Sequence, residues 1–196
     1  MRKLSVHFDD TDMKIVGEQQ PRLHYDHFDA LDFIRETKQQ RFNGNIAKAK
    51  TLGANIVSAF SYKAAPDELY NMAKEMGIEI DSQLLLQIKI LSVFSAEYCL
   101  NSYLPSPMLS TVAVQELYDV LMEISSDFYD ELSRSTAFSL YYMCVKQNDS
   151  SARKVGEQFA MLCGKSSDES YIQFGTKQHE LNTEVYKKAI QGFAFA

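Results

Sequence analysis

Apolar side chains recur at intervals of three and four residues along most of this chain, the spacing of one face of an α-helix. The pattern is strongest between about 82 and 103, where apolar residues occupy every side of the expected helix. A helix of that kind is buried at the centre of a soluble protein. We therefore expect a central helix with these apolar positions: Leu84, Leu85, Leu86, Ile88, Ile90, Leu91, Val93, Phe94, Tyr98, Cys99 and Leu100.

Turn-forming residues separate the other helical stretches. Asn-Gly at 43–44, Gly77 and Gly164 suit the positive φ that ends a helix, and the prolines of LPSP (104–107) end the central one. Asp81 or Ser82 can cap the central helix. The other predicted helices cover about 26–42, 46–62, 66–76, 110–125, 128–146, 151–163 and 168–191, the last with Gly175 as a weak point.

The first residues follow a different pattern. KLSVHF (3–8) alternates apolar and polar positions, DDTD supplies a turn, and MKIV (13–16) follows, which together predict a small β-hairpin. We expect residues 1–20 to be this extended segment and residues 21–196 to be a single helical domain. The predicted fold is all-α: a bundle of about eight helices in successive antiparallel hairpins. A short solenoid-like stack is the alternative.

Two short stretches resemble each other. ELYNMAKEM (68–76) is echoed by ELYDVLMEI (116–124), and FSAEYC (94–99) by FSLYYMC (138–144). The spacing is 48 residues for the first pair and 44 for the second, so the register slips. Duplicated helical hairpins are one interpretation. The other is that any amphipathic helix selects Leu, Tyr and Glu.

The composition supports a helical domain with an uneven charge. Gly (8) and Pro (4) are scarce among 196 residues, and apolar residues make up 45%. The net charge is −6, but residues 64–131 contain 12 acidic and 2 basic side chains. An acidic segment repels phosphate, so nucleic-acid binding there is disfavoured. Its acidic face is either simply solvated or a docking surface for a basic partner.

Compartment and membrane signals are sparse. Asp9 and Asp10 come before any apolar stretch of signal-peptide length. The longest apolar stretch, LLLQIKILSVF, contains Gln87 and Lys89, whereas a membrane helix needs about 20 mostly apolar residues. The three separated cysteines form no CxxC and indicate reduced, core-packed thiols. We expect a cytoplasmic protein without a membrane span.

Metal and cofactor chemistry is weakly represented. His24, Asp26 and His27 with Asp29 and Asp32 supply metal-ligand residue types, but their spacing is not the i, i+4 spacing of helical zinc ligands. We therefore predict no metal site and no cofactor. Phosphate-binding glycine loops, dinucleotide fingerprints and GxSxG are absent from the sequence. A Cys–His pair that meets only in space stays open.

Glu97 interrupts the central apolar helix, and a carboxylate there must be paired or change its pKa. It acts as a general base or forms a polar site in a pocket, or else it reaches a Tyr hydroxyl or a Lys or lies at the rim. Aromatic residues near it could line a groove for a peptide or an apolar ligand; the alternative is an aromatic core. The predicted binding residues are Phe94, Glu97, Tyr98, Phe138, Tyr141 and Tyr142.

Three functions follow from these observations. The leading hypothesis is a non-enzymatic interaction or regulatory module that binds a protein partner or a second copy of itself. The first alternative is a helical bundle that binds a small apolar ligand, or carries an enzymatic site, near Glu97. The second is a transcriptional regulator that uses residues 33–57, where Lys38, Arg41, Lys48 and Lys50 form a basic patch around a helix–turn–helix.

Overall fold

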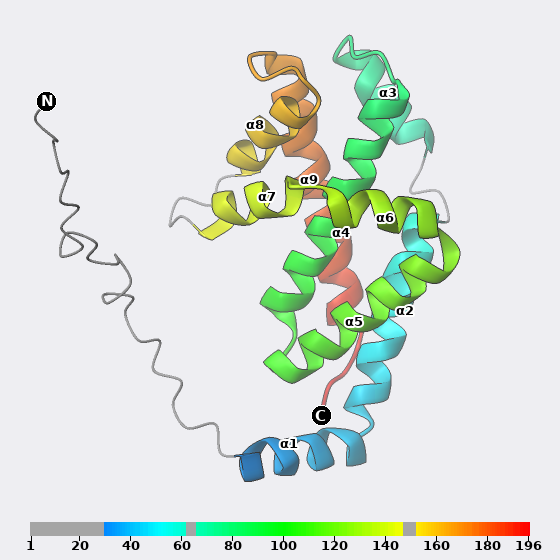
Figure 1. The fold of residues 1–196 in the computed structure, drawn as a ribbon, viewed down its shortest axis with the longest axis vertical. Helices are drawn as coiled ribbons and strands as arrows, with labels where there is room; N and C mark the ends of the chain where they lie inside the picture. The colour runs from blue at the N-terminus through cyan, green and yellow to red at the C-terminus, as the bar shows by residue number, and fades with distance from the viewer. Residues whose placement is uncertain (1–29, 62–65, 147–151) are drawn as a thin grey trace, which may run out of the picture. The chain divides into compact units, whose positions relative to one another are not determined.

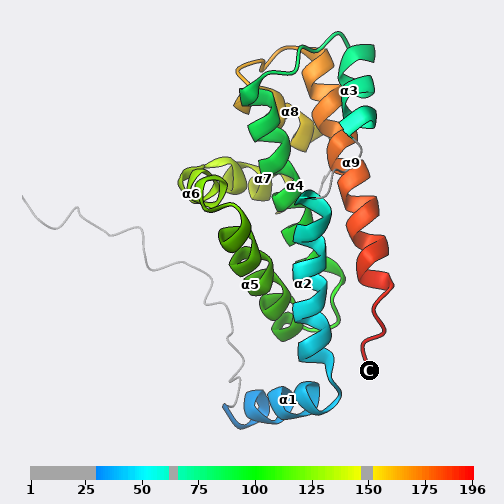
Figure 2. The same cartoon turned by 90° about the vertical axis from the view of Figure 1, so that its right-hand side faces the viewer.

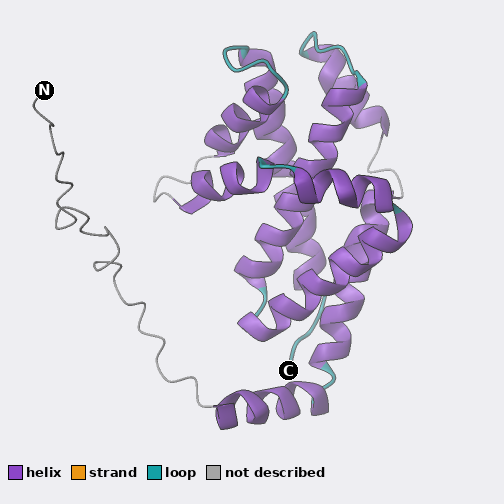
Figure 3. Cartoon of the chain, in the orientation of Figure 1, coloured by secondary structure: helices purple, strands orange, loops and turns teal. Residues whose placement is uncertain are grey.

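The computed structural model describes residues 30–61, 66–146 and 152–196, and these contain nine helices and no strand (Figure 3). The all-α prediction is confirmed for this part of the chain, whereas the predicted β-hairpin lies outside it. The chain divides into two units, Met1–Lys38 and Gln39–Ala196. The helices are α1 (Ala30–Phe42), α2 (Asn45–Ser61), α3 (Pro66–Glu75), α4 (Ser82–Tyr103), α5 (Pro107–Ile124), α6 (Ser126–Arg134), α7 (Ala137–Lys146), α8 (Ala152–Leu162) and α9 (Glu169–Gln191).

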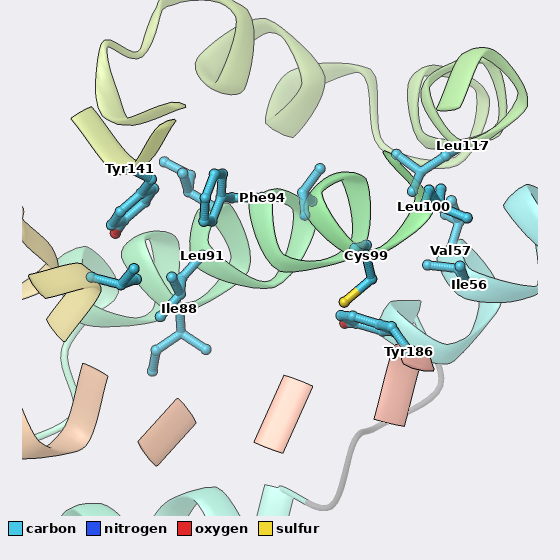
Figure 4. Packing of buried hydrophobic residues seen from close by; sticks show 14 of the residues in the cluster. Ile56, Val57, Ile88, Leu91, Phe94, Cys99, Leu100, Leu117, Tyr141 and Tyr186 are labelled. Atoms are coloured by element: carbon cyan, nitrogen blue, oxygen red, sulfur yellow. The ribbon is translucent and has the colours of Figure 1, made fainter. Parts of the chain in front are cut away.

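The second unit is a helical bundle organised around α4, which packs against α2, α5, α7, α8 and α9 (Figure 1). Its buried side chains point in several directions, as the apolar pattern predicts. Figure 4 shows Phe94 directed toward Tyr141 on one side of α4 and Cys99 toward Tyr186 on another. Burial on all sides explains why this helix lacks a polar face.

The same helix passes the length and composition test for a membrane span, alone among the helices of the described residues. More than half of its most apolar 18-residue window (56%) is buried inside the protein. The packing of five other helices against α4 accounts for its apolar character. Membrane insertion is not needed to explain it.

Two helix pairs approach closely because glycines lie at their contacts. A Cβ at Gly53 of α2 would collide with the Ala113 carbonyl of α5, and one at Gly156 of α8 would collide with the Ile172 carbonyl of α9. Both pairs run side by side in Figure 1 and Figure 2. Gly175, predicted as a weak point, lies inside an unbroken α9 and instead accommodates the Phe159 ring.

The predicted turns and caps are confirmed where the structure describes them. Gly44, Gly77 and Gly164 have φ values of 73°, 69° and 71°. The Asp81 carboxylate accepts from the Leu84 N–H at 2.7 Å and caps α4. Each device satisfies backbone groups that a helix end leaves unpaired.

The predicted helix 128–146 is wrong, because two helices occupy this stretch. Ser135 has extended backbone angles (φ −78°, ψ 138°) that end α6. Its hydroxyl accepts from the Ala137 N–H at 3.1 Å, which supports the start of α7. Serine competes with helical hydrogen bonding through this type of local bond. The Ser135–Thr136 pair is the sequence signal that the apolar periodicity obscures.

The two echoed stretches occupy different positions in the bundle. Residues 68–76 form most of the short helix α3, whereas residues 116–124 form the second half of α5. Residues 94–99 lie in the middle of α4, and residues 138–144 form most of α7. The echoed stretches therefore occupy helices of different length and different positions within those helices.

Candidate functional site

Glu97 of α4 joins three helices through its carboxylate. Tyr142 of α7 donates to Oε1 at 2.7 Å, and Tyr118 of α5 donates to Oε2. Both carboxylate oxygens therefore have a phenol donor, at a half-buried position. The interpretation that Glu97 reaches a Tyr hydroxyl is confirmed. We call Glu97, Tyr118 and Tyr142 the carboxylate clamp.

The clamp keeps its phenols protonated. Burial raises the pKa of Tyr118, and the neighbouring Glu97 charge raises it further. Burial is also the main cause of the raised pKa of Tyr142, followed by its hydrogen bond to Glu97. A protonated phenol donates to a carboxylate, so the arrangement holds charge and donors in place. Its chemistry is that of a structural connection between helices.

An aromatic cluster surrounds Phe94 beside the clamp. The ring of Phe94 lies 4.9 Å from that of Tyr141 and 5.8 Å from that of Phe138, measured between centroids. Tyr98, Tyr142 and His179 complete its ring contacts. All six predicted binding residues therefore come together. Phe94 and Tyr141 are fully buried, whereas Glu97, Tyr98, Phe138 and Tyr142 are half-buried.

A small open cleft of about 240 Å³ lies at the edge of this cluster. Its lining residues come from α5, α6 and α7: Tyr118, Tyr129, Leu132, Ser133 and Phe138. Tyr118 belongs to both the clamp and the cleft, and Phe138 belongs to both the aromatic cluster and the cleft. The sequence prediction named only Phe138 among the five. The strongly amphipathic α6 was the available signal for Tyr129, Leu132 and Ser133, whereas Tyr118 lies on α5.

Acidic side chains occupy the same helices as the cleft. We call these the α5–α6 acidic surface: Glu116, Asp119, Glu123, Asp127, Asp130 and Glu131. All are exposed except the half-buried Glu116. Glu116 pairs with Lys50 at 3.4 Å and Asp130 with Arg134 at 3.6 Å. Within the described residues, no ion pair is found for Glu123, Asp127 or Glu131.

A buried polar contact lies between α4 and α9. The His179 Nδ1 is 2.8 Å from the Ser95 hydroxyl, which also donates to the Leu91 carbonyl. Burial lowers the pKa of His179 to about 4, so this imidazole is neutral at physiological pH. Asn182 donates to the Ser92 hydroxyl nearby along α9 at 3.1 Å. The sequence did not identify this contact, because its members lie 84 and 90 residues apart.

The cysteine thiols are poorly suited to nucleophilic chemistry. Burial raises the pKa of Cys99 to about 11 and that of Cys163 to about 12. Cys144 is buried, and its pKa is raised for the same reason. A thiol is nucleophilic as the thiolate, so all three are largely unreactive near neutral pH. Their surroundings fit core packing.

The candidate metal residues fall mostly outside the described part of the chain. The structure does not describe His24, Asp26, His27 or Asp29, and it does not describe the side chain of Asp32. Among the described residues, no group of three His, Cys, Asp or Glu side chains is placed to hold a metal ion.

The basic patch expected to bind DNA is partly engaged within the protein. Lys48 donates to the Ala194 carbonyl, and Lys50 pairs with Glu116 of α5. Gly53 of α2 is also packed against α5. Two of the four basic side chains are therefore already in contact with protein groups, which disfavours a phosphate-binding role for them.

Comparison with known proteins adds no family or relative. No family model matches the chain, and neither the curated proteins nor the solved structures contain a match.

Proposed function

We propose that this chain is a non-enzymatic cytosolic interaction module that binds a basic segment of a protein partner through α5 and α6. The observation that carries the proposal is an apolar cleft lined from α5, α6 and α7, where α5 and α6 carry mostly acidic charged side chains. Residues 107–134 contain six acidic side chains and one basic side chain, Arg134. Charge of one sign on the helices that form an apolar recess favours a partner with basic residues near an apolar anchor.

The cleft volume limits what the anchor can be. Pockets for drug-sized molecules measure roughly 300–1,000 Å³, and this cleft measures about 240 Å³. One apolar side chain of a peptide is a better match than a complete small molecule. Met122 and Ile124 are each 50% exposed at the end of α5 and add apolar surface beside the acidic side chains. The partner segment would thus combine Lys or Arg residues with a Leu-sized anchor.

A labelled peptide tests the proposal directly. The probe is a fluorescein-labelled 12-residue peptide with one Leu flanked by Lys residues, measured by fluorescence anisotropy at 50 mM and 300 mM salt. We expect E123Q/D127N/E131Q to weaken binding by about tenfold at low salt, because each lost charge contributes up to about 1 kcal/mol. Salt should weaken binding to the wild type more than to the variant.

A matched variant removes equal charge elsewhere. E75Q/E79Q/E180Q changes three exposed carboxylates outside α5 and α6 and should leave binding close to wild type. Ser133→Trp fills the cleft without changing charge and should abolish binding, with Ser133→Ala as its control. Equal affinity for both triple variants would show that the acidic surface has no docking role.

A small apolar ligand near Glu97 is the second candidate. One observation favours it: Tyr118 lines the cleft and also donates to Glu97, so an occupant of the cleft would lie next to a carboxylate. Native mass spectrometry of the protein purified from cells tests this candidate. A retained mass that is lost on denaturation would support it, whereas a bare chain would leave the interaction module as the better proposal.

A further inference from the structure

The segment 192–196, which follows α9, lies against the first turn of α2 (Figure 1 and Figure 2). The Asn45 side chain forms two hydrogen bonds with one residue of this segment, Ala196. Its Nδ2 donates to the Ala196 carbonyl at 2.6 Å, and its Oδ1 accepts from the Ala196 N–H at 3.1 Å. The two bonded partners are 151 residues apart in the chain. Asn45 therefore bonds both the N–H and the carbonyl of Ala196.

Neighbouring side chains extend this recognition of the main chain. Asn43 Nδ2 also donates to the Ala196 carbonyl, at 3.1 Å, and Lys48 Nζ donates to the Ala194 carbonyl. None of these bonds involves a side chain of the bound segment. Contacts of this kind fix a backbone and tolerate changes of sequence, as in other modes of peptide recognition.

The Asn45 amide that contacts Ala196 is buried, so its hydrogen bonds affect stability more than those of an exposed side chain. Asn45 is 1% exposed, and its Nδ2 has a second partner in Gln40 Oε1 at 2.6 Å. A buried amide left without hydrogen-bond partners destabilises the folded state. The buried Asn45 amide therefore needs a carbonyl and an N–H as partners, and Ala196 supplies both.

Aromatic side chains of the segment add apolar contacts. Phe193 and Phe195 are half-buried, stack at 6.3 Å between centroids, and pack against the hydrophobic core. Ala194 and Ala196 are small and exposed. The segment that fits is thus non-helical, with alternating aromatic and small residues, and with a small residue opposite Asn45.

We propose that Asn43, Asn45 and Lys48 form a peptide-binding site, and that residues 193–196 are its resident, exchangeable occupant. The ligand class is a peptide with the aromatic–small alternation of this segment, supplied by a partner. Four polar contacts from Asn43, Asn45 and Lys48, two rings, and the bond from the Phe193 N–H to the Ile190 carbonyl are the contacts that hold residues 193–196 in the described part of the chain. Segments held this lightly open with a small fraction of the global unfolding free energy. The proposal does not depend on the α5–α6 acidic surface.

The first test uses the full chain and a fluorescein-labelled GFAFA amide, the sequence of residues 192–196 with a blocked end. F193S/F195S weakens the resident segment while leaving its backbone present. We expect this variant to bind the peptide at least tenfold more tightly than the wild type, whose own segment competes. Adding Asn45→Asp should reduce binding at least tenfold, because a carboxylate opposes the bound carbonyl and donates nothing.

Asn55→Asp is the matched control, since it makes the same change at an exposed position of α2. It should leave peptide binding unchanged. Asn43→Ala, at a half-buried position, provides a second loss-of-binding variant if N45D does not fold. No binding by a folded F193S/F195S chain, or equal binding with and without the Asn43 and Asn45 changes, would overturn the proposal.

Hydrogen exchange tests the exchangeable character separately. The Ala196 N–H is bonded to Asn45 and should exchange much faster than the amides of α4 and α9, without unfolding of the bundle. Excess unlabelled GFAFA peptide should raise its exchange rate further by displacing the resident segment. Exchange of this amide only through global unfolding would show a permanent structural contact and would refute the proposal.

Discussion

At the scale of single residues, two neighbouring tyrosines of α7 have opposite roles. Tyr142 donates to the Glu97 carboxylate at 2.7 Å. The Tyr141 ring is fully buried beside Phe94, but its hydroxyl has no hydrogen-bond partner within the described residues. A hydrogen bond to a charged group contributes about 1.5–3 kcal/mol, whereas an unpaired buried hydroxyl is a cost. The contribution of each hydroxyl to the free energy of unfolding therefore depends on whether it has a hydrogen-bond partner.

The same substitution at both positions should change stability in different directions. Tyr142→Phe should lower the free energy of unfolding by about 1–2 kcal/mol, because the half-buried Glu97 loses one of its two phenol donors. Tyr141→Phe should leave stability unchanged or raise it by up to about 1 kcal/mol, because it removes an unpaired group. Urea denaturation of both variants checks this, and a larger loss for Tyr141→Phe would refute the assignment.

At the scale of elements, glycines decide which helices approach most closely. Gly53 permits the contact between α2 and α5, and Gly156 the one between α8 and α9. At Gly53 the nearest atom is the Ala113 backbone carbonyl, and at Gly156 the Ile172 carbonyl lies beside the Thr176 hydroxyl; a backbone carbonyl cannot rotate away as a side chain can. Helix propensity alone would favour Ala at these positions by about 1 kcal/mol. Packing must outweigh that preference.

Gly53→Ala should therefore destabilise the protein although it improves helix propensity. Overpacking costs typically 1–3 kcal/mol, and a rigid backbone neighbour places this site at the upper end. We expect a net loss of about 1–2 kcal/mol in thermal or urea denaturation. Asn55→Ala is the exposed control in the same helix and should change stability by no more than about 0.5 kcal/mol. A stabilised Gly53→Ala variant would contradict the close approach.

The helices were largely predictable from the sequence, and their lateral contacts were not. Apolar periodicity located α4, and Gly44, Gly77 and Gly164 marked turns because their chemistry is local. The division between α6 and α7 was missed, because one Ser135 hydrogen bond overrides a continuous apolar pattern. Glu97 was identified as unusual, but its partners lie 21 and 45 residues away. Sequence patterns are local, so they do not identify side chains that meet only after the helices pack.

At the scale of the whole molecule, the α4–α9 interface links folding to pH. His179 is buried against Ser95, Phe94 and Tyr98, and burial lowers its pKa from 6.5 to about 4. Between these two values the unfolded chain binds a proton that the folded chain does not. Stability from the neutral imidazole is therefore complete above pH 6.5 and is lost as pH falls toward 4. Protonation of His179 would place a charge in this buried interface, which destabilises the folded state.

This titration predicts a specific acid sensitivity. A difference of 2.5 in pKa corresponds to about 3 kcal/mol, most of it lost between pH 6.5 and 4.5. Urea denaturation at half-unit steps of pH should show this loss for the wild type. His179→Gln should lower stability at pH 7 but follow a flatter curve below pH 6.5, because glutamine does not titrate. Acidic side chains that titrate in the same range affect both proteins alike, so the difference between the curves isolates His179. Parallel curves would mean that His179 takes up its proton in the folded state, and that the α4–α9 interface admits water.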